Sequence, residues 1–207
     1  MVAAERAEID LGARLRAERM RAGLSLRELA RRLGLTASAV SQFETGKSKP
    51  SVGTLFEIVE LLGVSLDDML KSPHVPQAPA RIRGPASGDV SSPDRVVEIE
   101  RQVDHAVIKL GRGVQWEQLG HQVANAEFLL VTYNPGSSSS MNGNPTRHKG
   151  REFGYMISGE LDVNIGAEVY KVREGDSIAF PASAPHELRN AGTVPAKVMW
   201  CIFALDQ

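Results

Sequence analysis

The sequence predicts two domains of different class, an all-helical N-terminal domain and an all-β C-terminal domain of barrel or sandwich type. Up to about residue 70, apolar residues recur three or four positions apart, as one face of a helix requires. Residues 71–94 are rich in proline and glycine and lack this period. From residue 95 onward, short β-branched and aromatic runs are bounded by Gly, Asn and Pro. We therefore expect a helical domain at 1–70, a linker at 71–94 and a β domain at 95–207.

The amino-acid composition is that of an ordinary globular protein. Of the 207 residues, 42% are apolar and 24% are charged. No apolar run approaches the roughly 20 residues that a membrane span needs, and the charged N-terminus lacks the apolar core of a secretory signal. Cys201 is the single cysteine, which excludes an intrachain disulfide and a zinc site built from paired cysteines. These features predict a cytoplasmic protein.

Start and stop signals divide the first 70 residues into five short helices. Ser25 begins a capping box that Glu28 completes three residues later. Thr36 is the expected N-cap of the next helix, and Gly46 ends that helix. The remaining signals are the N-cap candidates Ser51 and Ser65 and the C-cap candidate Gly63.

Residues 25–46 predict two short helices joined by a tight turn. Gly34, at the centre of the turn, can take the left-handed backbone conformation that a sharp corner demands. Four apolar side chains are expected to pack the corner from inside: Leu29, Leu35, Val40 and Phe43. The outer face of the second helix is expected to present Thr36, Ala37, Ser38, Ser41, Gln42 and Thr45. Small and amide side chains of this kind can enter a major groove and meet base edges.

Charge is distributed unevenly along the chain. The formal net charge of the whole chain is -1, which alone argues against a nucleic-acid-binding protein. Residues 11–50, however, hold nine basic side chains against three acidic ones, a local balance of +6. Phosphate binding needs a basic face, and this segment can supply one. A merely solvated charged surface is the alternative interpretation.

Residues 24–70 resemble the phage-repressor (XRE) type of helix-turn-helix over its five-helix length. The pattern Q-x-E-x-G, a basic loop and P-S-x-x-T-L follow one another at the spacing usual in that family. The resemblance implies base contacts from Ala37, Ser38, Ser41 and Gln42 on the face that begins at Thr36. It implies phosphate contacts from Arg27, Thr45, Lys47 and Lys49. Members usually bind pseudo-palindromic operators as dimers, so double-stranded DNA and a second copy of the chain are the implied partners.

Two segments of the C-terminal half resemble the paired motifs of the cupin family. The first, H-x-H-x3-E-x6-G, is matched by His148, Glu152 and Gly159. The second, G-x5-P-x-G-x2-H-x3-N, is matched by Gly175, Pro181, His186 and Asn190. Thr146 replaces the first histidine of motif one, and Ser183 replaces the inner glycine of motif two. The resemblance implies a double-stranded β-helix, that is, a jelly-roll barrel.

The matched cupin residues include a candidate metal site. Two imidazoles and one carboxylate, from His148, Glu152 and His186, form the facial-triad set that suits Fe(II) and also Mn, Ni or Zn. Because Thr146 is a poor ligand, the usual fourth protein ligand is missing. The alternative is a metal-free polar pocket that holds an organic ligand through hydrogen bonds.

The residues around motif one give a weaker indication of ligand binding. Arg147, Arg151 and Tyr155 flank the motif, and an arginine there could meet a ligand carboxylate or phosphonate. Residues 134–150 are rich in serine, glycine and asparagine and precede the motif. Such a segment is either a lid over the barrel mouth or a plain connection between strands.

Taken together, these features predict a sequence-specific transcriptional regulator and not an enzyme. A small-molecule effector, with or without a metal ion, would bind the cupin domain and modulate operator binding. One alternative is an oxygenase, because the same two-domain architecture resembles the iron-dependent hydroxypropylphosphonate epoxidases. Another is a DNA-binding protein whose barrel serves chiefly as a dimer interface. The repressor-like pattern of the second helix and the basic residues around it favour the regulator.

Overall fold

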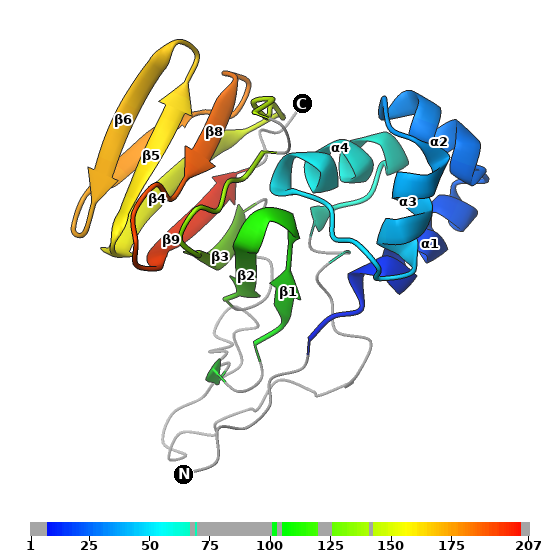
Figure 1. Cartoon of the computed structure of the whole chain (residues 1–207), viewed down its shortest axis with the longest axis horizontal. Coiled ribbons are helices and arrows are strands. Elements are labelled where there is room, and N and C mark those ends of the chain that lie inside the picture. The colour runs from blue at the N-terminus through cyan, green and yellow to red at the C-terminus, as the bar shows by residue number, and fades with distance from the viewer. Residues whose placement is uncertain are drawn as a thin grey trace, which may run out of the picture.

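A computed structural model describes residues 8–66, 69, 101–102, 105–119, 126–140 and 143–203. Figure 1 shows the helices gathered on one side and the strands on the other, so the two predicted classes are confirmed. The expected linker at 71–94 and residues 95–100 at the start of the expected β domain lie outside the described residues. Within the described part, no helix is long and apolar enough to span a membrane.

Four helices make up the described N-terminal part: α1 (Leu11–Arg21), α2 (Leu26–Arg32), α3 (Ala37–Glu44) and α4 (Val52–Leu62). The side chains of Ser25, Thr36 and Ser51 cap α2, α3 and α4 as expected, each accepting a backbone N–H from the third residue along. A fifth helix was expected after Ser65. Of that segment only Leu66 and Met69 are described, so the described count is four.

The helix-turn-helix corner forms as the sequence predicts. Gly34 has φ +65°, the left-handed conformation that makes the sharp turn possible. Leu29, Ala30 and Val40 form a small buried cluster at the corner, against which Leu35 is partly buried. Phe43, also expected inside, is buried in the neighbouring larger cluster. The corner is therefore held by apolar packing, which leaves the outer face of α3 to polar residues.

A buried ion pair ties α1 to the end of α3. The Arg19 guanidinium contacts both carboxylate oxygens of Glu44, with Nε–Oε1 at 2.5 Å and Nη2–Oε2 at 2.9 Å. Nη1 of Arg19 also donates to the Leu24 carbonyl at 2.7 Å. Glu44 is the acidic residue of the Q-x-E-x-G pattern, so this pattern has a structural role. It anchors the last turn of the second helix of the helix-turn-helix.

The strands form two antiparallel sheets. The larger has the order β1-β2-β3-β9-β4-β7, and the smaller has the order β6-β5-β8. The bounds are β1 Val107–Lys109, β2 Val114–Gln118, β3 Ala126–Tyr133, β4 Arg151–Ser158, β5 Glu160–Ile165, β6 Glu168–Arg173, β7 Ser177–Pro181, β8 His186–Arg189 and β9 Ala196–Phe203. The described strands are thus bonded into two sheets and do not close into the expected single barrel.

One strand, β8, was not predicted from its sequence. Its residues HELR contain no β-branched or aromatic side chain, so they carry no local strand signal. Pairing creates the strand, because residues 162–165 of β5 align with it on one side. On the other side, isolated bridges join Thr146 to His186 and Ser138 to Arg189. This placement brings His186 beside motif one.

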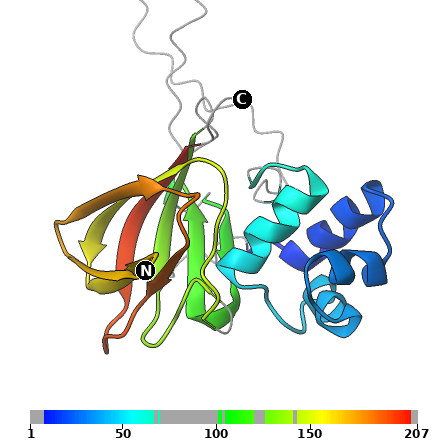
Figure 2. The same cartoon turned by 90° about the horizontal axis from the view of Figure 1, so that it is seen from above.

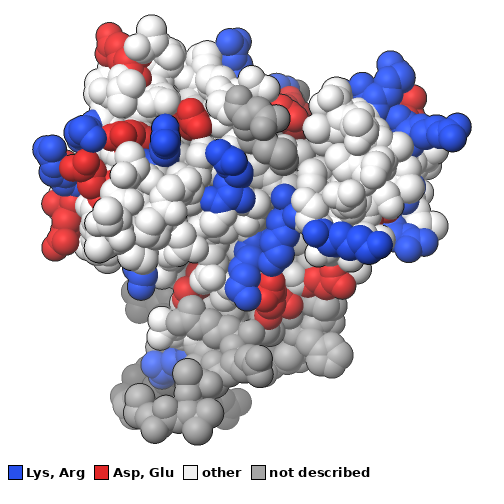
Figure 3. All heavy atoms as spheres, viewed as in Figure 1, with Lys and Arg blue, Asp and Glu red and all other residues white. Residues whose placement is uncertain are grey.

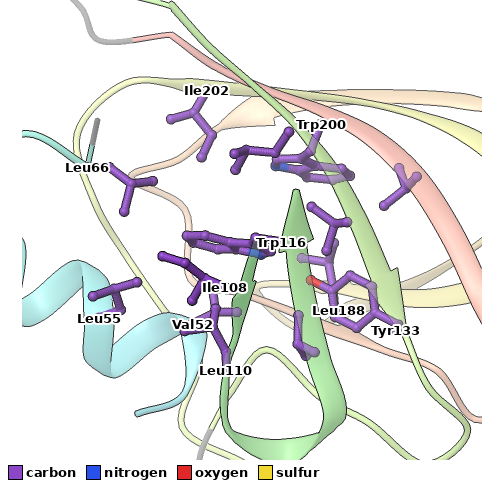
Figure 4. Close-up of a cluster of buried hydrophobic side chains, with 14 of the residues drawn as sticks. Val52, Leu55, Leu66, Ile108, Leu110, Trp116, Tyr133, Leu188, Trp200 and Ile202 are labelled. Carbon is purple, nitrogen blue, oxygen red and sulfur yellow. The ribbon is translucent and has the colours of Figure 1, made fainter. Parts of the chain in front are cut away.

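Helix α4 packs directly against the β half, as seen in Figure 2. Figure 4 shows Val52 and Leu55 of α4 in one cluster with Ile108, Leu110 and Trp116. Backbone bonds reinforce the contact. The Gly53 N–H donates to the Ser139 carbonyl at 3.1 Å, and the Gly111 N–H donates to the Pro50 carbonyl at 2.8 Å. The helical and β halves therefore share a continuous apolar core.

Glu44→Gln should lower the free energy of unfolding by about 3 kcal/mol, because it leaves the buried Arg19 charge without its partner. Urea denaturation followed by circular dichroism measures the change. Glu28→Gln is the matched control, since Glu28 pairs with Arg31 and Arg32 at the exposed surface. An equal loss in both variants would contradict the anchoring role of Glu44.

Candidate functional site

Two histidines and one glutamate converge inside the β half. His148 Nε2 lies 2.5 Å from Glu152 Oε1, and His186 Nε2 lies 3.3 Å from the same oxygen. All three side chains are less than 10% exposed. Their candidate ligand atoms lie within 4.8 Å of one another. The structure therefore brings together the three residues that the cupin resemblance singled out.

Strand pairing explains how residues so far apart in sequence meet. Thr146 and His186 exchange two backbone hydrogen bonds, of 2.8 and 3.0 Å, and the His148 N–H donates to the Ala182 carbonyl at 3.1 Å. Glu152 belongs to the inward-facing set of β4, where burial alternates along the strand. His148 and His186 thus reach the same interior point as the carboxylate.

The hydrogen bonds behind the triad fix the direction of each ligand atom. Nδ1 of His148 donates to the Lys149 carbonyl at 3.1 Å, and Nδ1 of His186 donates to the Ala184 carbonyl at 2.9 Å. Glu152 Oε2 accepts from Trp200 Nε1 at 2.8 Å. Each Nε2 therefore faces the site, while Nδ1 is held by the backbone. Metal-bound histidines commonly have this arrangement.

The converging atoms need a positive species between them. With its proton on Nδ1, a neutral imidazole presents a lone pair at Nε2, and the Glu152 carboxylate presents lone pairs as well. Two such imidazoles and a carboxylate would repel one another unless a proton or a metal cation lies among them. The donor set and its orientation therefore fit a divalent first-row metal ion.

Glu152 and His186 shift each other's pKa values through their hydrogen bond and their charges. Burial raises the pKa of Glu152, but hydrogen bonds with His148 and His186 outweigh burial and bring that pKa down to about 2. Burial lowers the pKa of His186, yet its hydrogen bond to Glu152 and the carboxylate charge leave the pKa raised overall. Glu152 is therefore ionised at neutral pH, ready to bind a cation.

The space beside the triad is small and mostly apolar. The cavity has a volume of about 20 Å³, room for about one water molecule. Trp116, Tyr133 and Trp200 contribute aromatic walls to it. Thr146, which stands where the cupin motif has its first histidine, also lines it. The Thr146 hydroxyl is buried and has no hydrogen-bond partner among the described residues, so it is available to a water or ligand atom.

Sequence reasoning missed the contribution of α4 to this site. Val52 and Phe56 line the cavity, and the Phe56 ring stacks on the His148 ring with centroids 4.1 Å apart and an interplanar angle of 11°. Phe56 also meets Trp116 edge-on at 5.9 Å. In the sequence both α4 residues belong to an apolar helical stripe, which gives no sign of a ligand site.

The residues expected to flank the ligand do not line the cavity. Arg151 and Tyr155 differ from Glu152 by odd numbers of positions on β4, so they point to the opposite, exposed face of the sheet. Arg147 is exposed as well. None of these three residues lines the cavity, and their contact with a ligand stays a prediction.

The serine-rich segment before motif one is partly fixed in place. Ser137 to Ser140 are buried, and the Ser138 and Ser140 hydroxyls donate to Glu187 at 2.6 and 2.8 Å. The Ser139 N–H donates to the Leu188 carbonyl. Residues 141 and 142 lie outside the described part. The described serines therefore form an edge of the smaller sheet and not a lid.

The expected DNA-contacting residues are all exposed or partly exposed in the helical half. Arg27, Thr36, Ser38, Gln42, Thr45 and Lys47 are exposed, and Ala37, Ser41 and Lys49 are partly exposed. Figure 3 shows Lys and Arg side chains projecting from the helical half. Two hydroxyls are occupied locally, since Thr36 caps α3 and Thr45 donates to the Ser41 carbonyl at 2.8 Å. Lys49 forms an ion pair with Glu8 at 2.9 Å.

Comparison with protein families supports the division of the chain. Residues 15–69 match the helix-turn-helix family HTH_3, and residues 129–202 match the cupin domain family Cupin_2. The HTH-type transcriptional regulator PuuR of Escherichia coli is 28% identical over 179 residues, covering 86% of each chain. The HTH-type transcriptional regulator SutR of the same organism is 23% identical over 191 residues, covering 88% of each chain.

A solved structure has the same arrangement of folds. An HTH_3 family transcriptional regulator from Vibrio cholerae superposes with a TM-score of 0.62 at 19% identity, covering 95% of this chain and 96% of the other. At that identity the likeness concerns the fold alone. The iron(II) form of HppE covers 94% of this chain at 22% identity, but its TM-score of 0.44 carries no functional argument.

Replacing both His148 and His186 by alanine should abolish metal retention, because only the Glu152 carboxylate of the three ligands would remain. Purified protein is dialysed against Zn²⁺ or Fe²⁺, and bound metal is measured by atomic emission. His105→Ala is the control. His105 is not one of the three candidate ligands, and its Nδ1 atom lies 2.8 Å from Glu117 Oε1. Metal content equal to wild type in the double variant would exclude this site.

Proposed function

Because the chain joins an XRE-type helix-turn-helix domain to a cupin domain, as the regulators it resembles do, we propose that it is a one-component transcriptional regulator. The observation that carries this proposal is the exposed polar face of α3, which carries Ser38 and Gln42, while Arg27 and Lys47 on the neighbouring segments are exposed too. Ser38 and Gln42 would contact base edges, and Arg27 and Lys47 would contact phosphates. Such a regulator would act on DNA in the cytoplasm.

The cupin half supplies the sensing part of the proposal. A divalent first-row metal held by His148, Glu152 and His186 would leave open positions toward the cavity. When bound, such a metal supplies a Lewis-acidic anchor for an oxygen donor of the effector. The protein residues orient that donor: Trp200 holds the Glu152 carboxylate, and the Thr146 hydroxyl offers a hydrogen bond.

We propose that the regulator acts as a homodimer on a pseudo-palindromic operator. One helix-turn-helix reads one half-site, so two copies are needed for two half-sites about one helical turn apart. Apolar side chains exposed on the outer face of the larger sheet, Tyr155 and Phe203, suit contact with a second copy. Sedimentation equilibrium of Tyr155→Glu measures this contribution, and dimerisation as tight as in the wild type would exclude the face.

The enzyme alternative has weaker support. The curated relatives that span both halves are named as transcriptional regulators. An epoxidase-like role rests on the triad alone, which a sensor can equally use to hold its ligand. The exposed basic surround of α3 has no role in oxygen chemistry, whereas a regulator requires it.

Selection from fragments of the organism's own genome should recover specific duplexes, and their affinity should fall linearly on a log–log plot against salt. Recovery of no preferred sequence, with the protein folded, would contradict the regulator.

On a recovered duplex, Gln42→Ala should weaken binding by roughly 1 to 3 kcal/mol, the usual scale of one base contact, without changing the salt slope. Lys47→Ala should instead reduce the salt slope by about one. Fluorescence anisotropy at several salt concentrations separates the two effects. Gln115→Ala, on β2 of the cupin half, is the control. Unchanged affinity in Gln42→Ala would remove that residue from the interface.

A further inference from the structure

Helix α4 has one side in the cupin site and the other in the DNA-binding half. On the first side, Val52 and Phe56 line the cavity next to the triad. On the other, Leu61 and Leu62 pack against the cluster of Leu29, Ala30 and Val40, which holds α2 to α3. A single helix of 11 residues therefore contacts both sites.

Helix α4 packs tightly against Thr146 and His148. A Cβ atom built on Gly53 would lie 2.5 Å from the Thr146 hydroxyl oxygen, so the α4 backbone is already as close to that side chain as packing permits. Phe56 lies flat on the ring of His148, a triad residue, with centroids 4.1 Å apart. The helix therefore rests directly on two residues of the candidate site.

The size of the cavity limits what can enter while α4 stays in place. About 20 Å³ accommodates a metal ion or one water molecule but not an organic molecule of several heavy atoms. The wall opposite the sheets is Val52 and Phe56, which belong to a helix and not to the β framework. This helical wall is therefore the part of the lining that an organic ligand at the triad could displace without disturbing strand pairing.

We propose that α4 is the element that couples the cupin site to the DNA-binding helices, with Phe56 as its sensing residue. An organic effector gains access to the triad by displacing Phe56 from His148. The displacement moves α4, and α4 repositions α2 and α3 through Leu61 and Leu62. This inference rests on the proposed function and specifies its regulation: the site with Phe56 stacked on His148 and the liganded site differ in how α4 is docked.

Hydrogen exchange of the full-length, metal-free protein tests the coupling without an effector or an operator. His148→Ala removes the ring under Phe56, and we expect α4 amides at 52–62 to exchange about two- to tenfold faster, as loss of one aromatic contact predicts. Phe56→Leu, which keeps an apolar wall but loses the stack, should do the same. In the variant that carries both substitutions, α4 should exchange no faster than in the faster single variant, because each substitution removes the same stacking contact.

His105→Ala is the matched control, because it removes a partly buried histidine of the cupin half whose ring pairs with Glu117. Its α4 amides should exchange as in the wild type. Faster exchange at amides 29–40 in Phe56→Leu is also expected, because α4 packs on that cluster. Wild-type exchange of α4 in both His148→Ala and Phe56→Leu, with the variants folded, would overturn the proposal.

Zn²⁺ separates this inference from the proposed function. Zn²⁺ that binds the triad should slow exchange of α4 in the wild type and should do so less in Phe56→Leu, which retains all three ligands. Bound Zn²⁺ with equal slowing in both proteins would overturn coupling through Phe56. Failure of Zn²⁺ to bind would count against the metal site of the proposed function, while the metal-free comparison still decides the coupling.

Discussion

The buried carboxylate of Glu152 constrains the rest of the β half. An ionised carboxylate in an apolar interior is costly unless charges and hydrogen bonds compensate it. Here His148 and His186 approach one of its oxygens and Trp200 donates to the other. Those partners come from the segment before β4, from β8 and from β9, so three parts of the fold must be in register for the carboxylate to be satisfied.

The same requirement explains why α4 matters to the site. The imidazole of His148 has one edge toward Glu152 and one face toward Phe56. Any change in the triad that moves the His148 ring therefore also changes its contact with Phe56 of α4. Conversely, the helix limits the room beside the triad. The close docking of the two halves gives a binding event a physical path to the surface of α3.

Local signals predicted much of this structure. The caps at Ser25, Thr36 and Ser51 and the left-handed Gly34 follow from short-range rules, and all are present. The cupin motifs likewise predicted that His148, Glu152 and His186 share a site, and the structure brings these three residues together. The placement of Arg151 and Tyr155 was predictable too, because strand alternation puts them on the face of the sheet opposite to Glu152.

Other features depend on tertiary contacts that no local pattern encodes. Strand β8 has a polar sequence and exists through its pairing with β5. The stack of Phe56 on His148 joins residues of two different domains, and in the sequence Phe56 is one more apolar residue of an amphipathic helix. The small cavity beside the triad and the docking of α4 are likewise consequences of how the halves meet.

The central claim is that the cupin site controls the DNA-binding surface through α4. Its most direct test is the affinity of Phe56→Ala for a recovered operator at fixed salt, with Tyr170→Ala, an exposed aromatic residue on β6 of the smaller sheet, as reference. Phe56 is not among the proposed DNA-contacting residues. If the DNA-binding helices were not coupled to the cupin site, the loss of Phe56 would leave operator affinity unchanged. The account predicts an affinity about two- to tenfold different from that of the wild type, the scale of one aromatic contact. Equal affinities for Phe56→Ala and the wild type would contradict it.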